Sequence, residues 1–429
     1  MLPLLRVLIV FCITLEAKAI LRKYKPHIVA VTGSVGKTST KDAVYAVLST
    51  AFFVRKSDKS FNSEIGIPLT ILGCPNAWNN PFGWLRNLLE GLLLILLPNH
   101  YPSWLVLEVG ADRPGDIEKI ARWISPEVVV VTRIPSVPAH VEFFKNPEAV
   151  VQEKSYILKT LKPGGVAIMS DDDEAVARLM PPSHATRLRF GFTHGADFLG
   201  GNEEVLYREG RPSGIGFRID YKGSSSPVQV EGVVGRQHLY PFLAAAAVGV
   251  SCGLTLVSAA EALSKHTPPP GRMKIISGKH GSTLIDDTYN SSPIAATEAL
   301  QTLRNIETAG RKIAILGDML ELGSFSKEEH QRIGEQAASS ATHLWTVGLR
   351  AEVMGESAYE AGLTKRNIKH FSDSREAGIT LAKIITTDDV VLVKGSQSMR
   401  MERVVERGMA HPEEKEKLLV RQETEWKKR

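Results

Sequence analysis

The chain has 429 residues, of which 43% are hydrophobic and 23% are charged. This balance is typical of a folded protein of two or three domains, and it excludes a disordered, collagen-like or coiled-coil chain. The net charge of +5 comes without a basic stripe interleaved with aromatic residues, so nucleic acid is not an expected partner. Three scattered cysteines, Cys12, Cys74 and Cys252, exclude a disulfide framework and a cysteine-based zinc cluster.

The first 25 residues differ in character from the rest of the chain. An apolar run from Val7 to Leu15 precedes four basic residues: Lys18, Arg22, Lys23 and Lys25. The run is too short for a spanning helix, which needs about 20 residues. A small-residue stretch at 17–19 resembles a signal-peptidase site, but a nucleotide-binding motif follows shortly afterwards. We therefore expect an uncleaved helix that contacts the inner face of the cell membrane peripherally; the alternative is a helix that packs on the first domain.

A second apolar stretch, from Pro81 to Pro98, is rich in leucine and also too short to span a membrane. Arg86 and Glu90 lie four residues apart in it, so they can pair on one face of a helix. We expect this helix to be buried in the protein. The alternative is an interfacial patch beside the N-terminal helix.

Short apolar, β-branched runs then alternate with helical patterns that begin near Lys37, Gly115 and Pro147; the runs are residues 27–32, 105–108, 128–132 and 166–169. The alternation is typical of βαβ units and predicts an α/β fold with a mainly parallel central sheet of the P-loop type. From about residue 187 to 234, short strands with glycine-rich turns predict an antiparallel annex. An alanine-rich helix follows over 239–254.

A stiff break at Pro268-Pro269-Pro270-Gly271 is the best candidate for a domain boundary. Strands at 283–286, 312–316, 343–347 and 390–393 follow it and again alternate with helices, which predicts a second, smaller Rossmann-like α/β domain. We therefore divide the chain into an N-terminal helix (1–25), a central α/β domain (26–267), a C-terminal domain (268–411) and a charged tail (412–429). The tail is expected to be a solvated helix.

The strongest motif is the glycine-rich turn V-A-V-T-G-S-V-G-K-T-S at residues 29–39, which follows a strand and opens a helix. Backbone N–H groups and the helix dipole favour phosphate at such a turn. Lys37 supplies a cation for the β- and γ-phosphates of ATP, and the Thr38 hydroxyl is placed for Mg²⁺. Val31 replaces the usual first glycine, so the loop is a variant of the form T-G-x-x-G-K-[ST]. Its predicted ATP-binding residues are Gly33, Ser34, Val35, Gly36, Lys37, Thr38 and Ser39.

Polar side chains also follow three other strands. Glu108 ends one apolar strand, and His140 follows the next. Asp287 and Asn290 follow the first strand of the second domain. Since ligands of open α/β sheets gather at the carboxyl ends of the strands, Glu108 is a candidate Mg²⁺ ligand, and Asp287 with Asn290 is a candidate nucleotide contact. Taken alone, His140 is more often a surface histidine.

In this order and combination, the motifs resemble the Mur ligases, ATP-dependent ligases of peptidoglycan precursor synthesis. Within that family the chain is most similar to the branch that joins D-alanyl-D-alanine to a muramyl tripeptide. The matching segments lie between residues 27 and 405, and the last two are specific to that branch: 32–39, 60–70, 107–116, 149–154, 270–272, 284–290, 316–323 and 393–402.

The resemblance implies a cytoplasmic enzyme that uses ATP and two Mg²⁺ ions. It also assigns the residues to four roles: Lys37, Lys154, His140 and Arg272 to catalysis; the loop 33–39 with Asp287 and Asn290 to ATP; Thr38, Glu108, His140 and a carbamylated Lys154 to metal; and Asn62, Ser63 and Glu64 to the acceptor substrate. The carbamate rests on family position alone.

Three departures from the family pattern are visible. The family's N-terminal UDP-binding domain does not precede the loop at residue 33, so recognition of the uridine end is expected to differ. The family's histidine–asparagine pair before the alanine-rich helix reads Gln237-His238 here, which changes the expected adenine contacts. The approach to His140 reads R-I-P-S-V-P over residues 133–138 instead of an asparagine- and glycine-rich loop.

The leading hypothesis is therefore an ATP-dependent amide ligase, monomeric, that joins D-Ala-D-Ala to a muramyl tripeptide through an acyl phosphate. One alternative is a related ligase that acts on a lipid-linked precursor or another carboxylate at the membrane. A second is a non-catalytic ATP-binding scaffold, which is disfavoured because a protein without catalysis has no physical need to keep Lys37, Glu108 and Lys154 together.

Overall fold

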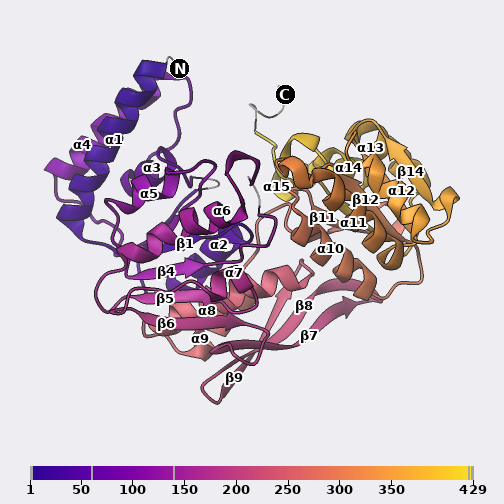
Figure 1. Ribbon diagram of the computed structural model, residues 1–429, viewed down its shortest axis with the longest axis horizontal. Coiled ribbons are helices and arrows are strands. Elements are labelled where there is room, and N and C mark those ends of the chain that lie inside the picture. Colours follow the sequence, from indigo (N-terminus) through magenta and orange to yellow (C-terminus); the bar gives the residue numbers. More distant parts are fainter. Residues whose placement is uncertain (1–2, 59–60, 139–140, 424–425, 427–429) are drawn as a thin grey trace.

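The structure is a computed structural model that describes residues 3–58, 61–138, 141–423 and 426. Figure 1 shows two halves side by side, each built on its own sheet. The first sheet has nine strands in the order β2-β3-β1-β4-β5-β6-β7-β8-β9. Its strands are β1 (His27–Thr32), β2 (Val54–Lys56), β3 (Trp104–Glu108), β4 (Val128–Val131), β5 (Val166–Ser170), β6 (Thr186–Gly191), β7 (Phe198–Arg208), β8 (Arg211–Tyr221) and β9 (Ser224–Glu231).

Helices cover both faces of this sheet because alternate residues of each central strand are apolar on both sides. In β1, Val29 and Val31 face one hydrophobic cluster, whereas Ile28 and Ala30 face another. The helices of this half are α1 (Pro3–Tyr24), α2 (Lys37–Leu48), α3 (Gly66–Leu72), α4 (Pro81–Leu96), α5 (Asp116–Ala121), α6 (Pro147–Ser155), α7 (Glu174–Ala177), α8 (Leu239–Ser251) and α9 (Leu256–Ser264).

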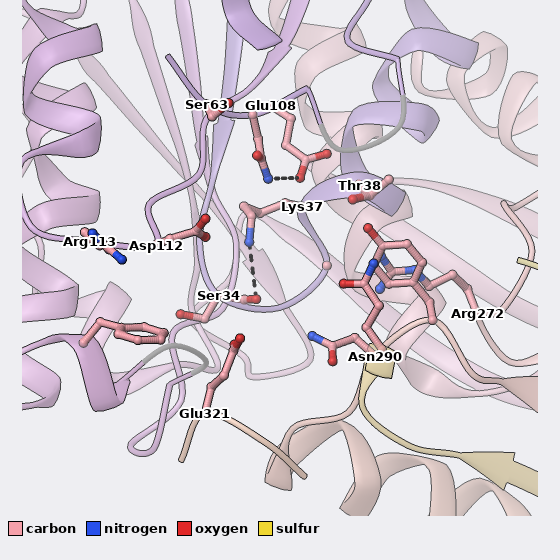
Figure 2. Close-up of a pocket in the computed structure, with 15 residues that line it drawn as sticks. Ser34, Lys37, Thr38, Ser63, Glu108, Asp112, Arg113, Arg272, Asn290 and Glu321 are labelled. Carbon is pink, nitrogen blue, oxygen red and sulfur yellow. Dashed lines mark hydrogen bonds between the residues drawn. The ribbon is translucent and has the colours of Figure 1, made fainter. Parts of the chain in front are cut away.

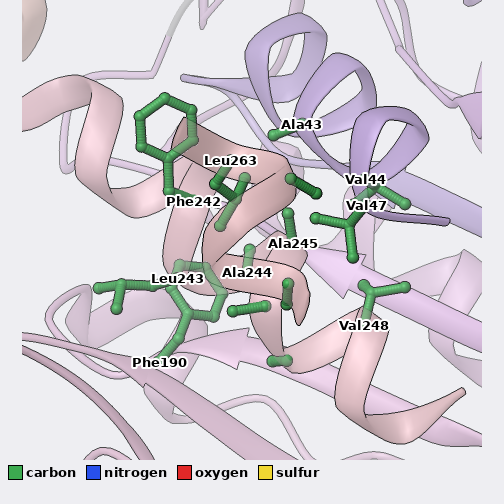
Figure 3. Close-up of a cluster of buried hydrophobic side chains, with 14 of the residues drawn as sticks. Ala43, Val44, Val47, Phe190, Phe242, Leu243, Ala244, Ala245, Val248 and Leu263 are labelled. Carbon is green, nitrogen blue, oxygen red and sulfur yellow. The ribbon is translucent and has the colours of Figure 1, made fainter. Parts of the chain in front are cut away.

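Close packing of α2 on α8 fixes the helix that carries the glycine-rich loop. Figure 3 shows Val44 and Val47 of α2 beside Ala245 and Val248 of α8, all fully buried. The small alanine side chains of α8 let the two helices approach closely, and their common core holds α2 in one position. The start of α2, and with it Lys37, is therefore placed by rigid elements.

The second sheet has six strands in the order β10-β11-β15-β12-β13-β14, parallel except for β10. The strands are β10 (Lys274–Ser277), β11 (Thr283–Asp287), β12 (Lys312–Gly317), β13 (His343–Val347), β14 (Ile368–Phe371) and β15 (Val390–Lys394). The helices are α10 (Pro293–Asn305), α11 (Ser326–Ser340), α12 (Glu352–Glu360), α13 (Ser374–Ile384), α14 (Glu402–Gly408) and α15 (Lys415–Leu418). The prediction of an α/β fold with a large, mainly parallel sheet and a second sheet is confirmed.

Three local predictions differ from the structure. The antiparallel annex predicted over 187–234 is confirmed for β7–β9 but not for β6, which pairs with β5 and β7 in parallel and joins β7–β9 to the central sheet. The helix over 81–96 is mostly not buried: only Trp84, Asn87 and Gly91 of it are inaccessible, and most of its leucines are exposed, although Leu88 and Leu94 pack against the core. A run of leucines looks the same in sequence whether it faces a core or the outside.

The charged tail is helical and mostly exposed over residues 412–418, but it packs against the protein at Leu419 and Arg421. Leu419 is 3% exposed, and Arg421 is 6% exposed. The Arg421 guanidinium donates to Glu402 (Nη2 to Oε2, 2.7 Å) and to the carbonyl oxygen of Tyr289 (3.0 Å). The tail packs because its apolar residues join the core of the second half and its arginine finds a buried carboxylate.

Candidate functional site

The glycine-rich loop passes between β1 and β4 and ends where α2 begins. Gly33 has φ 136°, and a Cβ there would lie 1.9 Å from Oγ1 of Thr132, so only glycine fits. Gly36, at φ 87°, is the residue before α2. The N–H groups of Ser34 and Val35 donate to the carbonyl of Arg133, at 2.9 and 3.1 Å. The donors left for a phosphate are therefore those of the first turn of α2, which have no partner within the helix.

A cavity of about 630 Å³ opens beside this loop and is lined by both halves of the molecule. Figure 2 shows Lys37 at its centre, with Glu108 and Thr38 on one side and Asn290 and Arg272 reaching in from the second half. Its lining residues are Ser34, Gly36, Lys37, Thr38, Asn62, Ser63, Glu108, Asp112, Arg113, Phe143, Arg272, Tyr289, Asn290, Glu321 and Gln397. Residues far apart in the sequence thus meet in a single site.

Lys37 lies in a mixed electrostatic environment. Its Nζ is 3.5 Å from the carbonyl oxygen of Ser34. Burial lowers the pKa of Lys37, and the nearby positive charge of Arg272 lowers it further. The negative charges of Glu108 and Asp112 act in the opposite direction and raise this pKa. A cation held with another cation nearby is stabilised when an anion enters between them. The cavity is therefore suited to a polyanion.

Glu108 carries the observation that fits a metal ion. It is 2% exposed at the end of β3. Its Oε1 accepts from Nδ2 of Asn62 at 3.3 Å, whereas its Oε2 is buried with no hydrogen-bond partner. A buried carboxylate oxygen without a donor is costly unless a cation occupies the space before it. With the Thr38 hydroxyl in the same cavity, these oxygen ligands suit Mg²⁺.

The remaining predicted metal ligands are placed less directly. Within the described ranges, no three His, Cys, Asp or Glu side chains gather as a metal cluster, and His140 lies outside those ranges. Lys154 is buried in α6 and is not among the residues that line the cavity. Burial, with Lys37 adding to it, lowers the pKa of Lys154 to about 7.

A smaller cavity of about 100 Å³ adjoins the loop on the side of the second half. Asp287 lines it, and its Oδ2 accepts from Nζ of Lys394 at 2.6 Å. The same Nζ donates to the carbonyl oxygen of Asn290 at 2.9 Å. Gln237 also lines this cavity, and both polar atoms of its amide are buried without a partner. An amide with a free donor and acceptor can recognise the edge of a base such as adenine.

Most of the predicted site residues line one of the two cavities, whereas a few lie elsewhere. Val35, Ser39 and Asp287 line the smaller cavity, which shares Ser34, Gly36, Arg272 and Asn290 with the larger one. Gly33 serves the turn itself. Glu64 is about half exposed and pairs with Arg6 at 3.3 Å, away from both cavities.

Sequence reasoning missed several lining residues, including Asp112, Glu321 and Gln397, as well as Gln237 and Lys394 of the smaller cavity. The position of Lys394 at the carboxyl end of a parallel strand could have indicated it, because ligands gather there. Gln237 stood out only as a departure from the family pattern. Its orphaned amide becomes visible in three dimensions.

Comparison with known proteins agrees with this arrangement. Two family profiles match: the Mur ligase middle domain over residues 31–81 and 89–249, and the Mur ligase glutamate ligase domain over residues 271–397. A UDP-N-acetylmuramoyl-tripeptide–D-alanyl-D-alanine ligase of Mycobacterium leprae is 31% identical over 396 residues, which cover 87% of this chain and 71% of that protein. The corresponding ligase of Bacillus subtilis is 27% identical over 390 residues, covering 91% and 77%.

Solved structures give the same result. The MurF ligase of Thermotoga maritima in complex with ADP superposes with a TM-score of 0.76 at 29% identity, covering 95% of this chain and 84% of that one. A MurF structure from Acinetobacter baumannii gives a TM-score of 0.75 at 25% identity, covering 92% and 79%. With its two sheets, its phosphate-type loop and a cavity between the halves, the chain belongs to the Mur ligase family.

Proposed function

We propose that this protein is an ATP-dependent ligase of peptidoglycan precursor synthesis that joins D-Ala-D-Ala to a muramyl tripeptide. The observation that carries the proposal is the cavity between the halves. It combines Lys37 and Thr38 at a phosphate-type helix start, the orphaned carboxylate oxygen of Glu108, and Arg272 and Asn290 from the second half. The relatives that match over most of the chain bear the name of this activity.

The first turn of α2 and Lys37 would bind the β- and γ-phosphates of ATP. Arg272, whose guanidinium lies 3.9 Å from the ring centroid of Tyr289, would approach the phosphates from the opposite wall. Asp287, Asn290 and Gln237 would hold the nucleoside in the smaller cavity. The ribose and adenine assignments rest on the family resemblance and on the position of these side chains.

Two Mg²⁺ ions, held by Thr38, Glu108, His140 and a carbamate on Lys154, would neutralise phosphate charge when bound. Lys154 suits this role because carbamylation needs a neutral amine. With its pKa lowered to about 7, a large share of the side chain is neutral at physiological pH. Addition of CO₂ to that amine releases one proton and leaves a carboxylate.

The acceptor carboxylate is a poor electrophile, so the reaction first converts it to an acyl phosphate with ATP. An oxygen of the acceptor carboxylate attacks the γ-phosphate, and ADP leaves with the cleaved bond's electron pair. The amine of D-Ala-D-Ala then attacks the acyl carbon, loses a proton, and phosphate leaves with one oxygen of the original carboxylate. Lys37 and Arg272 would stabilise the charge on the transferred phosphoryl group. Closure of the two halves would keep water from the acyl phosphate.

Asn62 and Ser63 line the cavity next to Glu108 and would face the acceptor. We place the enzyme in the cytoplasm, where ATP is available, and at the inner face of the cell membrane. We also propose that it acts as a monomer, since both halves of one chain contribute residues to the lining of the cavity. An acceptor carried on a lipid is the second candidate substrate, favoured by the exposed leucines of α4.

Phosphate release from ATP tests the proposal, with UDP-linked and lipid-linked muramyl tripeptides supplied with and without D-Ala-D-Ala. We expect release that needs both substrates, and a loss of 100-fold or more in the Lys37→Ala variant. Leu349→Ala, which changes an 84% exposed side chain outside the lining of the cavity, is the control and should keep parent activity. Release that ignores D-Ala-D-Ala, or that persists in folded Lys37→Ala, would contradict the assignment.

A further inference from the structure

The helices α1 and α4 lie at the outer end of the first half (Figure 1), and many of their exposed side chains are apolar. Many of the large apolar side chains that the structure shows exposed belong to these helices or to the residue that follows α4. They are Val7, Leu8, Phe11 and Leu15 of α1, and Phe82, Leu85, Leu89, Leu92, Leu93, Leu96 and Leu97, each between 45% and 81% exposed. We name this set the α1–α4 face.

The α1–α4 face is a built feature, because both helices are fixed on the protein by their other sides. Ile9, Ile13 and Ile20 of α1 are buried in the core of the first half. Lys23 joins the ends of the two helices, since its Nζ donates to the carbonyl oxygens of Leu94 and Ile95, both at 2.9 Å. A helix with one face anchored and the opposite face apolar leaves that face for a partner.

The exposed positions line up as stripes along the two helices. In α1 they follow the spacing of one helical face, and the same face continues into Lys18 and Arg22. In α4 the spacing from Phe82 to Leu96 also keeps to one face. Because α1 packs against α4, the two stripes lie on neighbouring helices, and the stripe of α1 is apolar along most of its length and basic at one end.

Charge at the margin indicates which partner fits. Two exposed cations, Arg22 and Lys25, lie beyond the apolar part of the face, whereas the exposed Arg86 on the flank of α4 is paired with an acid. Each helix contains one acidic residue, and neither pairs with Arg22 or Lys25. Glu90 pairs with Arg86 at 2.7 Å, and Oε2 of Glu16 is buried between the helices beside Gly91. An apolar stripe with a basic margin complements a bilayer with anionic headgroups.

From this geometry we infer that the α1–α4 face is a docking surface for an anionic lipid bilayer, with both helices lying in the plane of the interface. In the described part of the chain, no helix is long and apolar enough to cross a membrane. Attachment is therefore lateral: the leucines enter the boundary between headgroups and acyl chains, while the cations remain among the headgroups. This surface lies outside the ligase cavity and does not depend on the proposed substrates.

Co-sedimentation with vesicles tests the inference on the full chain. The vesicles are phosphatidylcholine alone, or phosphatidylcholine with phosphatidylglycerol. The test variant is the double substitution Leu89→Glu with Leu93→Glu. The matched control is Leu349→Glu with Met180→Glu, two side chains that are 84% and 78% exposed on other parts of the molecule. Thermal melting and size-exclusion chromatography with light scattering accompany each protein.

We expect the parent and the control to bind phosphatidylglycerol vesicles at least tenfold better than neutral ones, and the test variant to lose at least tenfold of that binding while melting as a folded protein. Arg22→Gln should weaken binding only to the anionic vesicles. If the test variant misfolds, the milder pair Leu89→Ser with Leu93→Ser replaces it. The inference would be overturned if the parent protein did not bind vesicles, or if the test variant bound them as well as the parent does. It would also be overturned if the parent were a dimer that does not bind vesicles and the test variant were a monomer.

Discussion

A buried ion pair joins the two halves of the molecule, and its removal gives a quantitative prediction. Arg133 follows β4, and Glu298 lies in α10. Both terminal nitrogens of the Arg133 guanidinium donate to the Glu298 carboxylate: Nη1 to Oε1, and Nη2 to Oε2 at 2.8 Å. The two side chains are 7% and 10% exposed, and the guanidinium lies 4.1 Å from the ring centroid of Tyr240. Arg133→Met would leave the Glu298 carboxylate buried without its cation.

Breaking a buried pair by removing one partner typically costs about 3–5 kcal/mol, because the remaining charge stays desolvated. We expect a loss of that size in the free energy of unfolding of Arg133→Met. The double variant Arg133→Met with Glu298→Leu should recover most of it, since no charge then remains buried. The exposed pair Arg208–Glu231 is a matched control: its atoms are 2.6 Å apart, but both side chains are 69% exposed. Arg208→Met should cost at most about 1 kcal/mol.

Urea unfolding followed by circular dichroism measures these differences, and small-angle X-ray scattering reports whether the halves separate. Part of the cost can appear as separation of the halves, because Glu298 regains water when they part. A loss in Arg133→Met no larger than that in Arg208→Met, with an unchanged radius of gyration, would refute the reasoning. So would a double variant that is as unstable as the single one.

Three further predictions concern single residues. Gly36→Ala should lower the free energy of unfolding by about 1–2 kcal/mol, because only the φ of 87° at this position is unfavourable for alanine. Gly33→Ala should cost more and also weaken nucleotide binding, since the added Cβ would overlap Oγ1 of Thr132. Urea unfolding and ATP titration measure the two effects. Lys154→Ala should lose ligase activity and regain part of it with added short carboxylates, and a variant as active as the parent would exclude the carbamate. Burial raises the pKa of Glu16 from 4.5 to about 7, so between these two pH values the folded state holds a proton that the unfolded state releases. The stability that this proton contributes is lost as pH rises from 4.5 through 7. Glu16→Gln should therefore flatten the fall in melting temperature between pH 5 and pH 8.

The parts of the fold and site that the sequence predicted are those written in local patterns. The turn between β1 and α2 was predictable because a β-branched run, two glycines and Lys37 stand within a few residues. Glu108 was predictable because a single carboxylate ends an apolar strand. In both cases the chemistry and the secondary structure are set by neighbouring residues.

The parts that escaped prediction depend on contacts between distant residues. Arg133 and Glu298 are 165 positions apart, and nothing local to either indicates the other. The orphaned amide of Gln237 appears only in three dimensions, where residues of both halves line the cavity around it. The outward leucines of α4 and the packed tail at Arg421 were misjudged, because hydropathy and charge along a segment do not say which neighbour the fold supplies.

The central claim, ligation through an acyl phosphate, is tested most directly by isotope transfer. A muramyl tripeptide whose terminal carboxylate carries ¹⁸O at both oxygens is incubated with ATP, Mg²⁺, D-Ala-D-Ala and the protein, and the released phosphate is analysed by mass spectrometry. The account predicts one ¹⁸O in each phosphate released, together with an amide product that has lost one label, and neither signal in Lys37→Ala. Unlabelled phosphate accompanied by amide formation would contradict it.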